Sequence, residues 1–239
     1  MFCCRDVDKE HSEVDNLIAK GKGKDEAIFQ VLKKLIVESK AVRFEGDGYS
    51  EGWKKEAAKR GLTNITSAPE AISKYLDKAS KDVLLGENIF NEVELHGRVE
   101  VEYEKFSKKV QIESRTLGDI ALNHIVPTAV AYQNRLIENL CGLKQLFSED
   151  EYEGLSEDRK DLIREISLHV TAIKKLIKRM TEERRTANTS DTEEKKAVVY
   201  DKVVRPTMEE IRFHIDALEL VIDDDIWPLP NYRELLFAK

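Results

Sequence analysis

Apolar residues recur at steps of three and four along the second half of this chain, the spacing that places them on one face of a helix. Three long segments carry the repeat: Leu122, Ile125, Ala129, Tyr132, Leu136, Leu140, Leu143 and Phe147 in the first; Ile163, Ile166, Val170, Ile173, Ile177 and Met180 in the second; Val204, Met208, Ile211, Ile215, Leu218 and Ile222 in the third. Each apolar seam requires partner helices at shallow crossing angles. Short connections, expected at residues 148–156 and 187–192, force neighbouring helices to run antiparallel. The pattern therefore predicts an all-α fold, an antiparallel bundle of long helices.

Two places in this region depart from a plain helical pattern. Pro127 lies inside the first long segment, so we expect that helix to kink there or to begin anew. Between Val99 and Glu104, glutamates alternate with apolar residues at a period of two, which is typical of a strand. Because the sequence shows no partner strand, we interpret residues 99–104 as helix.

The pattern before residue 91 predicts smaller helices. An apolar face over residues 27–36 indicates a helix within residues 9–42, which the glycines at 21 and 23 break in two. Ser50 is a typical N-cap for a helix over residues 53–60, and Gly61 is a typical stop. A further helix over residues 69–76 begins with a proline, and residues 77–91 are expected to be loop with a little helix. We therefore divide the chain at residues 1–91 and 92–239, with one continuous domain as the alternative.

The chain ends in an apolar and aromatic segment that contains two prolines. Pro228 and Pro230 prevent a helix there, because proline lacks the amide donor and its ring clashes with the preceding turn. The remaining residues carry much apolar area: Trp227, Leu229, Tyr232, Leu235, Leu236 and Phe237. Leaving that area in water is unfavourable, so we expect a docked tail, either on this bundle or on a neighbouring subunit.

Composition limits the classes of function. Charged residues make up 36% of the chain and glycine and proline are few, which is typical of long solvent-facing helices. A net charge of -7 with both signs interspersed provides no basic stripe for nucleic acid. No apolar stretch reaches the ~18 residues of a membrane span, and the N-terminus lacks the apolar core of a signal peptide. Cys3, Cys4 and Cys141 lack the spacing of a zinc site and indicate reduced thiols in a cytoplasmic protein.

Two pairs of carboxylate and imidazole side chains offer candidate metal chemistry. Glu165 precedes His169 by one helical turn, and Glu210 precedes His214 by the same spacing, on neighbouring predicted helices. Di-iron bundles use a Glu-x-x-His spacing, which is one residue shorter, together with further glutamates aimed inward. We therefore interpret the two histidines as flanking the core, and a metal site as the alternative.

Other candidate groups have plainer interpretations. His124 lies in a stretch with few charges, so we interpret it as a buried or interface histidine that hydrogen-bonds to a neighbour. The sequence offers it no nucleophile or acidic partner at a recognisable catalytic spacing. Glu100, Glu102 and Glu104 offer oxygen ligands for a divalent cation, but on a helix they spread over different faces and are interpreted as solvated.

A turn at Gly46-Asp47-Gly48 is weakly similar to a phosphate-binding loop. It lacks the G-x-x-x-x-G-K-[ST] arrangement and follows no clear strand. We interpret its glycines as supplying positive φ in a tight turn.

Several blocks stand in a fixed order along the chain: FEGDGYSEGW at 44–53, EAAKRGL at 56–62, IESRTLGDIA at 112–121, NHIVPTAV at 123–130, ENL at 138–140 and WPLPNYRELLF at 227–237. Together they resemble the C-terminal part of the type III glutamine synthetases, the large bacterial class. The resemblance extends over the chain from about Lys20, and in that family this tail closes the polypeptide.

The resemblance implies an ATP-dependent ligase that joins ammonia to glutamate, with divalent cations (Mg or Mn) and a double-ring dodecamer. In that family the nucleotide, metal and glutamate ligands lie N-terminal to the matching region. The resemblance therefore assigns no catalytic, cofactor-binding or metal residue to this chain. It implies a structural and assembly domain that is inactive alone, with residues 1–91 packed on the catalytic domain and with contacts to neighbouring subunits.

Two alternatives to a purely structural role remain open. The turn at residues 46–53 would help to complete the synthetase site, with Tyr49 and Trp53 as the residues to test. Otherwise the chain is a free-standing helical-bundle module for interaction or metal binding.

Overall fold

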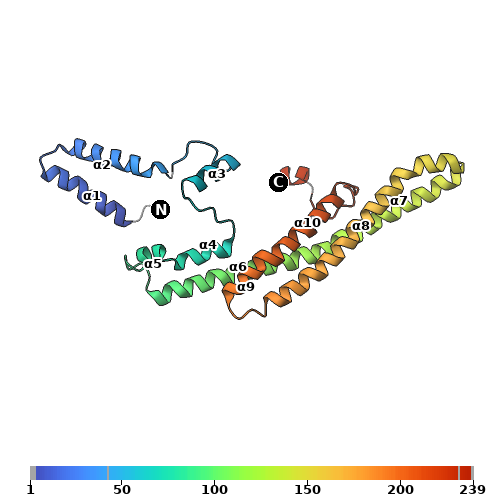
Figure 1. Cartoon of the computed structure of the whole chain (residues 1–239). Coiled ribbons are helices and arrows are strands. Elements are labelled where there is room, and N and C mark those ends of the chain that lie inside the picture. Colours follow the sequence, from blue (N-terminus) through green and yellow to red (C-terminus); the bar gives the residue numbers. More distant parts are fainter. Residues whose placement is uncertain (1–3, 42, 231, 238–239) are drawn as a thin grey trace. The chain divides into compact units, whose positions relative to one another are not determined.

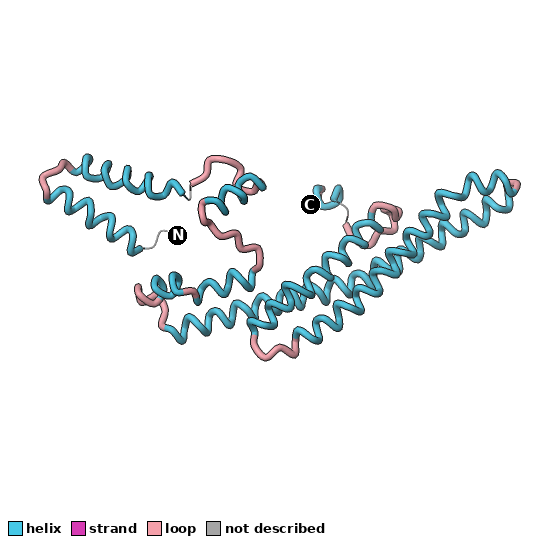
Figure 2. Tube along the Cα trace, viewed as in Figure 1, coloured by secondary structure: helices cyan, strands magenta, loops and turns pink. Residues whose placement is uncertain are grey.

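The computed structural model describes residues 4–41, 43–230 and 232–237, and every regular element in these ranges is a helix (Figures 1 and 2). The elements are α1 (Cys4–Ala19), α2 (Lys24–Glu38), η1 (Ser39–Ala41), α3 (Glu51–Lys59), α4 (Ala68–Ser73), η2 (Lys74–Leu76), α5 (Lys78–Leu84), α6 (Glu92–Ile120), η3 (Ala121–Ile125), α7 (Val126–Leu146), α8 (Glu149–Ala187), α9 (Glu193–Val199), η4 (Tyr200–Val204), α10 (Arg205–Glu219) and α11 (Tyr232–Leu236). The predicted all-α class is confirmed, and residues 99–104 are helical as interpreted. The chain forms two compact units, unit 1 (residues 1–99) and unit 2 (residues 100–239), so the division falls inside α6.

Unit 1 consists of short helices whose ends follow the sequence signals. The predicted break between α1 and α2 is confirmed, and Gly21 there has a φ of 88°. The Ser50 side chain accepts a hydrogen bond from the Trp53 amide and so caps α3, and Gly61 follows this helix with a φ of 76°. Positions that require a positive φ after a helix are usually occupied by glycine, because it has no Cβ to clash with the backbone.

Unit 2 is a bundle of long antiparallel helices. Figure 1 shows α7 and α8 side by side in opposite directions, with α10 along the other part of α8. The short connection predicted at residues 148–156 is present, but its predicted extent is wrong, because α7 ends at Leu146 and α8 already begins at Glu149. Ser148 and Glu151 form a capping box that satisfies amides at this helix start, so the chain turns within two residues. The connection predicted at 187–192 is confirmed at residues 188–192.

The core of unit 2 is formed by the predicted seams. Its fully buried large side chains include Ile125 next to α7, Ile166, Ile173 and Met180 on α8, and Ile211 and Leu218 on α10. Helix α6 contributes buried small residues, Ser107, Ser114 and Gly118, as well as the buried Val110 of the core cluster. A Cβ on Gly118 would lie 3.5 Å from Met180 Cε, so α6 approaches α8 closely at this point.

Both internal prolines of the bundle follow a π-helical segment. The segment η3 ends two residues before Pro127, and η4 ends two residues before Pro206. In each segment the closing bond spans five residues, from the Val126 amide to Ala121 and from the Arg205 amide to Tyr200. Proline cannot donate an amide hydrogen and its ring clashes with the carbonyl four residues earlier, so a widened turn accommodates it without ending the helix. The irregularity predicted at Pro127 is thus a π segment.

Among the helices of the described ranges, we find none with both the length and the apolar character needed to cross a membrane.

Candidate functional site

The segment at residues 43–61 consists of a turn followed by α3, and its own aromatic and cationic side chains hold it together. Phe44 stacks on Trp53 with ring centroids 4.2 Å apart. The Arg60 guanidinium lies 5.6 Å from the centre of the Trp53 ring and donates a hydrogen bond of 2.7 Å to the Arg43 carbonyl. The start of the turn, at Arg43 and Phe44, is therefore held against α3.

Within this turn, the predicted positive φ at Gly46 and Gly48 is wrong. Among the described residues only Gly21, Gly61 and Asn88 have positive φ. Glycine at position 46 is explained by packing instead, because a Cβ there would lie 2.6 Å from the Phe44 ring. The sequence signal for this packing is the Phe44-x-Gly46 spacing ahead of Trp53.

The polar groups of the turn are occupied by its own backbone. The Asp47 carboxylate accepts a hydrogen bond of 2.9 Å from the Tyr49 amide, and the Asp47 carbonyl accepts one of 2.8 Å from the Ser50 hydroxyl. The result is a well-defined turn that presents Tyr49 to solvent, with 95% of that residue exposed. Such an arrangement is suited to insertion of an aromatic ring into a partner.

The two predicted histidines lie closer together than sequence reasoning indicated. His169 on α8 and His214 on α10 meet with their Nδ1 atoms 2.9 Å apart. At this distance the ring N–H of one imidazole donates to the unprotonated nitrogen of the other. Burial, together with the neighbouring His169, lowers the pKa of His214 below its ordinary value. The pair therefore favours at least one neutral ring and links α8 to α10.

The carboxylates of the two Glu-x-x-x-His motifs do not join this pair in a shared site. The Oε1 atom of Glu165 lies 3.9 Å from the Nε2 atom of His169, on the other edge of the ring from the contact with His214. Glu210 accepts a hydrogen bond of 2.7 Å from Arg179. In the part of the chain that the structure describes, no three histidine, cysteine or acidic side chains converge as metal ligands.

The other candidate groups lie on exposed surfaces. His124 is exposed on η3, so the buried alternative is wrong, because its neighbour Ile125 takes the inward position; the interface alternative stays a prediction. Glu102 pairs with Lys105 at 2.7 Å and Glu104 pairs with Lys108 at 2.5 Å, each along the surface of α6. Cys141 is a free, exposed thiol, whereas Cys3 and the side chain of Cys4 lie outside the described part.

The C-terminal tail divides into a docked part and an exposed part. Trp227 is buried in the core of unit 2, and Ile226 and Leu229 pack against that core. Amides of Ile226 and Trp227 donate to the Asp223 carbonyl, which folds the chain back after α10. Beyond the prolines, Leu235, Leu236 and Phe237 are 60% exposed or more. The first part thus docks within this chain, and the last part keeps its apolar side chains outside.

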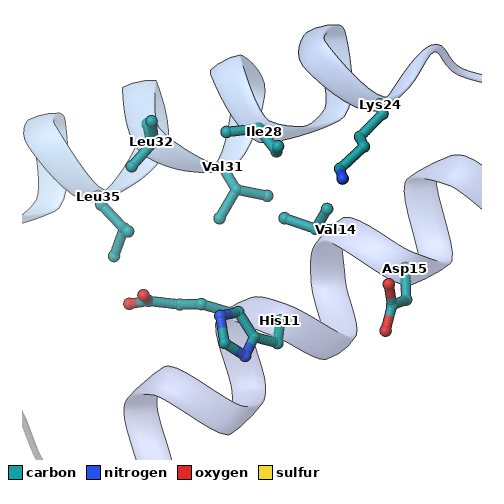
Figure 3. Close-up of a pocket in the computed structure, with 9 residues that line it drawn as sticks. His11, Val14, Asp15, Lys24, Ile28, Val31, Leu32 and Leu35 are labelled. Atoms are coloured by element: carbon teal, nitrogen blue, oxygen red, sulfur yellow. The ribbon is translucent and has the colours of Figure 1, made fainter.

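A groove lies along one side of the α1–α2 hairpin in unit 1. Its volume is about 530 Å³. Figure 3 shows Val14 on α1 and Val31 on α2 pointing toward each other, with Ile28 and Leu35 beside them. Glu10, His11 and Asp15 line the α1 side and Lys24 lines the α2 side, so an apolar floor has a charged rim with more acidic than basic groups.

Comparison with known proteins gives a consistent result. A family model described as the glutamine synthetase C-terminal domain matches residues 27–144. The chain is 61% identical over 228 residues to a glutamine synthetase of Bacteroides fragilis, which covers 95% of this chain and 31% of that protein. It is 29% identical over 221 residues to a type-3 glutamine synthetase of Dictyostelium discoideum, with 89% and 29% covered. A glutamine synthetase of Butyrivibrio fibrisolvens is 28% identical over 213 residues, with 89% and 30% covered. The chain spans about a third of the length of these relatives.

Proposed function

Because this chain belongs to the glutamine synthetase family and carries its C-terminal domain, we propose that it is the structural and assembly region of such an enzyme. The resemblance to type III enzymes supports that type, as does the Dictyostelium relative, a type-3 glutamine synthetase. In the whole enzyme, the other two thirds would bind ATP, a divalent cation and glutamate and would carry out the ligation of ammonia. The present region would be inactive alone and would support packing on that part and on neighbouring subunits.

The observation that carries this proposal is the incomplete core of unit 1. Among its described residues, the buried hydrophobic ones are few and mostly small: Ala27, Val31, Ala57, Leu95 and Val99. Twice as many large apolar residues are exposed: Ile18, Phe29, Leu32, Ile36, Val37, Phe44, Tyr49, Tyr75, Ile89 and Val93. Three of these residues, Phe29, Leu32 and Ile36, share one face of α2 at helical spacing, and an exposed apolar face of this kind is typical of a binding surface. Unit 2, in contrast, closes a core of its own with Trp227.

The test uses a full-length chimera in which this chain replaces the matching third of the Bacteroides fragilis relative. We expect the chimera to sediment as the same assembly as the parent enzyme and to form glutamine, whereas the relative without this third loses both properties. The isolated chain is expected to form no glutamine. A truncated relative that assembles and turns over like the intact enzyme would contradict the proposal.

A second role is favoured by the turn that presents Tyr49. We propose that this turn shapes the synthetase site in the assembled enzyme, since it holds an almost fully exposed aromatic ring in a defined position. In the chimera, Tyr49→Ala is expected to change the KM for a substrate and to leave the sedimentation of the assembly unchanged. Wild-type kinetics in this variant would exclude the role.

A further inference from the structure

Helix α2 has two apolar faces, and α1 covers only one of them. Ala27 and Val31 are buried against α1, with Ile28 and Leu35 half-buried beside them. A second row stands at steps of three and four: Phe29, Leu32 and Ile36, with exposed fractions of 65%, 51% and 53%. A helix that is apolar over so wide an arc is suited to packing between two other helices.

The two sides of the α1–α2 contact also differ, because one side is closed by polar groups and the other is open and apolar. On one side Lys34 of α2 forms an ion pair of 2.7 Å with Glu13 of α1, which closes that side with polar groups. On the other side lies the groove of Figure 3, and Leu32 belongs both to its wall and to the exposed row. Groove and exposed row therefore form one continuous apolar surface, which we call the α2 docking face (Ile28, Phe29, Leu32, Leu35, Ile36).

We propose that an amphipathic helix from the other two thirds of the same enzyme packs on the α2 docking face. This inference rests on the proposed function and names the surface through which unit 1 would be completed. A helix fits better than a small molecule, because a ligand in the groove would leave Phe29 and Ile36 in water. Apolar residues at i, i+3, i+4 and i+7 would match the equally spaced row on α2.

The length of the relatives favours an occupant from the same polypeptide. This chain corresponds to about a third of them, so roughly two thirds of the enzyme is available as a covalently linked partner. A linked segment binds at a high effective concentration and needs less contact area than a separate protein. The rim carries the acidic Glu10 and Asp15 on α1 and the basic Lys24 on α2. Its excess of acidic charge favours a lysine or arginine beside the apolar stripe of the occupant.

The direct test is photo-crosslinking in the full-length chimera. A benzophenone amino acid at position 29 is expected to crosslink to one helical segment of the remaining two thirds, identified by mass spectrometry. The matched control places the same probe at position 30, which lies about 100° around the helix and whose side chain meets Lys22. This control is expected to give no crosslink to that segment.

Three results would overturn the inference: no crosslink from position 29, a crosslink to a second copy of the α2 docking face, or equal crosslinking from position 30. If these occur while the chimera still assembles as the parent enzyme, the proposed function stands and only this surface is wrong. If the chimera does not assemble, the proposed function itself fails.

A charge variant provides a second measurement. Leu32→Glu with Ile36→Glu is expected to leave the helicity of the isolated chain unchanged, since both residues are more than half exposed. In the chimera the same two substitutions should prevent the helix from docking and so expose α1 and α2. Their cleavage by trypsin should then be about tenfold faster. Cleavage at the wild-type rate would contradict docking at this face.

Discussion

Trp227→Ala is expected to lower the free energy of unfolding of unit 2 by about 3–5 kcal/mol. Trp227 is 7% exposed and belongs to the bundle core. An indole buried to this degree removes about 200 Å² from water, which contributes about 5 kcal/mol at about 25 cal/mol per Å². This value is an upper bound, because real unfolded chains already bury part of that area.

Trp227→Phe separates the packing of this ring from its polar group. The indole Nε1 is buried and has no hydrogen-bond partner among the described residues. Phenylalanine keeps most of the apolar contact and removes the unsatisfied N–H, whose burial costs about 1–3 kcal/mol. We therefore expect this variant to lose less than about 1.5 kcal/mol, well below the loss for alanine.

The assay is urea unfolding followed by far-ultraviolet circular dichroism, with Leu220→Ala as the control. Leu220 is an apolar residue of the same region that is 87% exposed, so its truncation is expected to change stability by less than about 0.5 kcal/mol. If Trp227→Ala lowers stability no more than Leu220→Ala, the tail does not close the core of unit 2 and the reasoning is wrong.

Three further predictions address other sites. Gly118→Ala is expected to stabilise α6 by about 0.5–1 kcal/mol, because the new Cβ would meet Met180 and Ile177 at ordinary contact distances of 3.5 and 3.8 Å; a lower urea midpoint would contradict this. Gly46→Ala should displace the Phe44 ring from Trp53 and change the near-ultraviolet dichroism and Trp53 emission, so unchanged spectra would refute the packing role of Gly46. Because the pKa of His214 is lowered in the folded state, stability is expected to be fully present above the ordinary pKa of imidazole and to decrease as the pH falls below it. His214→Gln should flatten this decrease and His124→Gln, at an exposed position, should not; equal slopes in both variants would contradict the assignment.

The helices of the bundle could be predicted because a period of three and four is a local property of the sequence. The seam residues Ile166, Ile173 and Ile211 are indeed fully buried. The start of α8 could not be predicted from periodicity, because the first helical turn after the capping box at Ser148 consists mainly of polar residues. A cap of this kind is visible in the sequence as Ser followed three residues later by Glu.

Contacts between distant residues were harder to predict than helices. His169 and His214 stand at the edge of two apolar seams, but their contact depends on the register of α8 against α10, which no local pattern specifies. The stacking of Phe44 on Trp53 likewise depends on the path of the turn. For the tail, apolar content predicted docking, yet only the structure separates the buried Trp227 from the exposed Phe237.

The π segments lead to a last prediction about Pro206. A π segment holds one residue more than a regular α-helix, so deletion of Lys202 should convert η4 to α-helix while α9 and α10 keep their inward faces. With Pro206 retained, its ring would then meet the carbonyl four residues earlier, at a cost of about 3 kcal/mol. Combining the deletion with Pro206→Ala should recover most of that loss.

Urea unfolding of the two deletion variants tests this explanation. The reference is Pro206→Ala in the chain that keeps Lys202. Buried residues of α10, among them Ile211, Ile215 and Leu218, fix the register of the helix, so this reference is expected to keep the π segment. Its stability should therefore stay within about 1 kcal/mol of wild type. If the single deletion is as stable as the deletion combined with Pro206→Ala, proline is not the reason for the widened turn, and the buried ends of η4, Tyr200 and Val204, become the remaining cause.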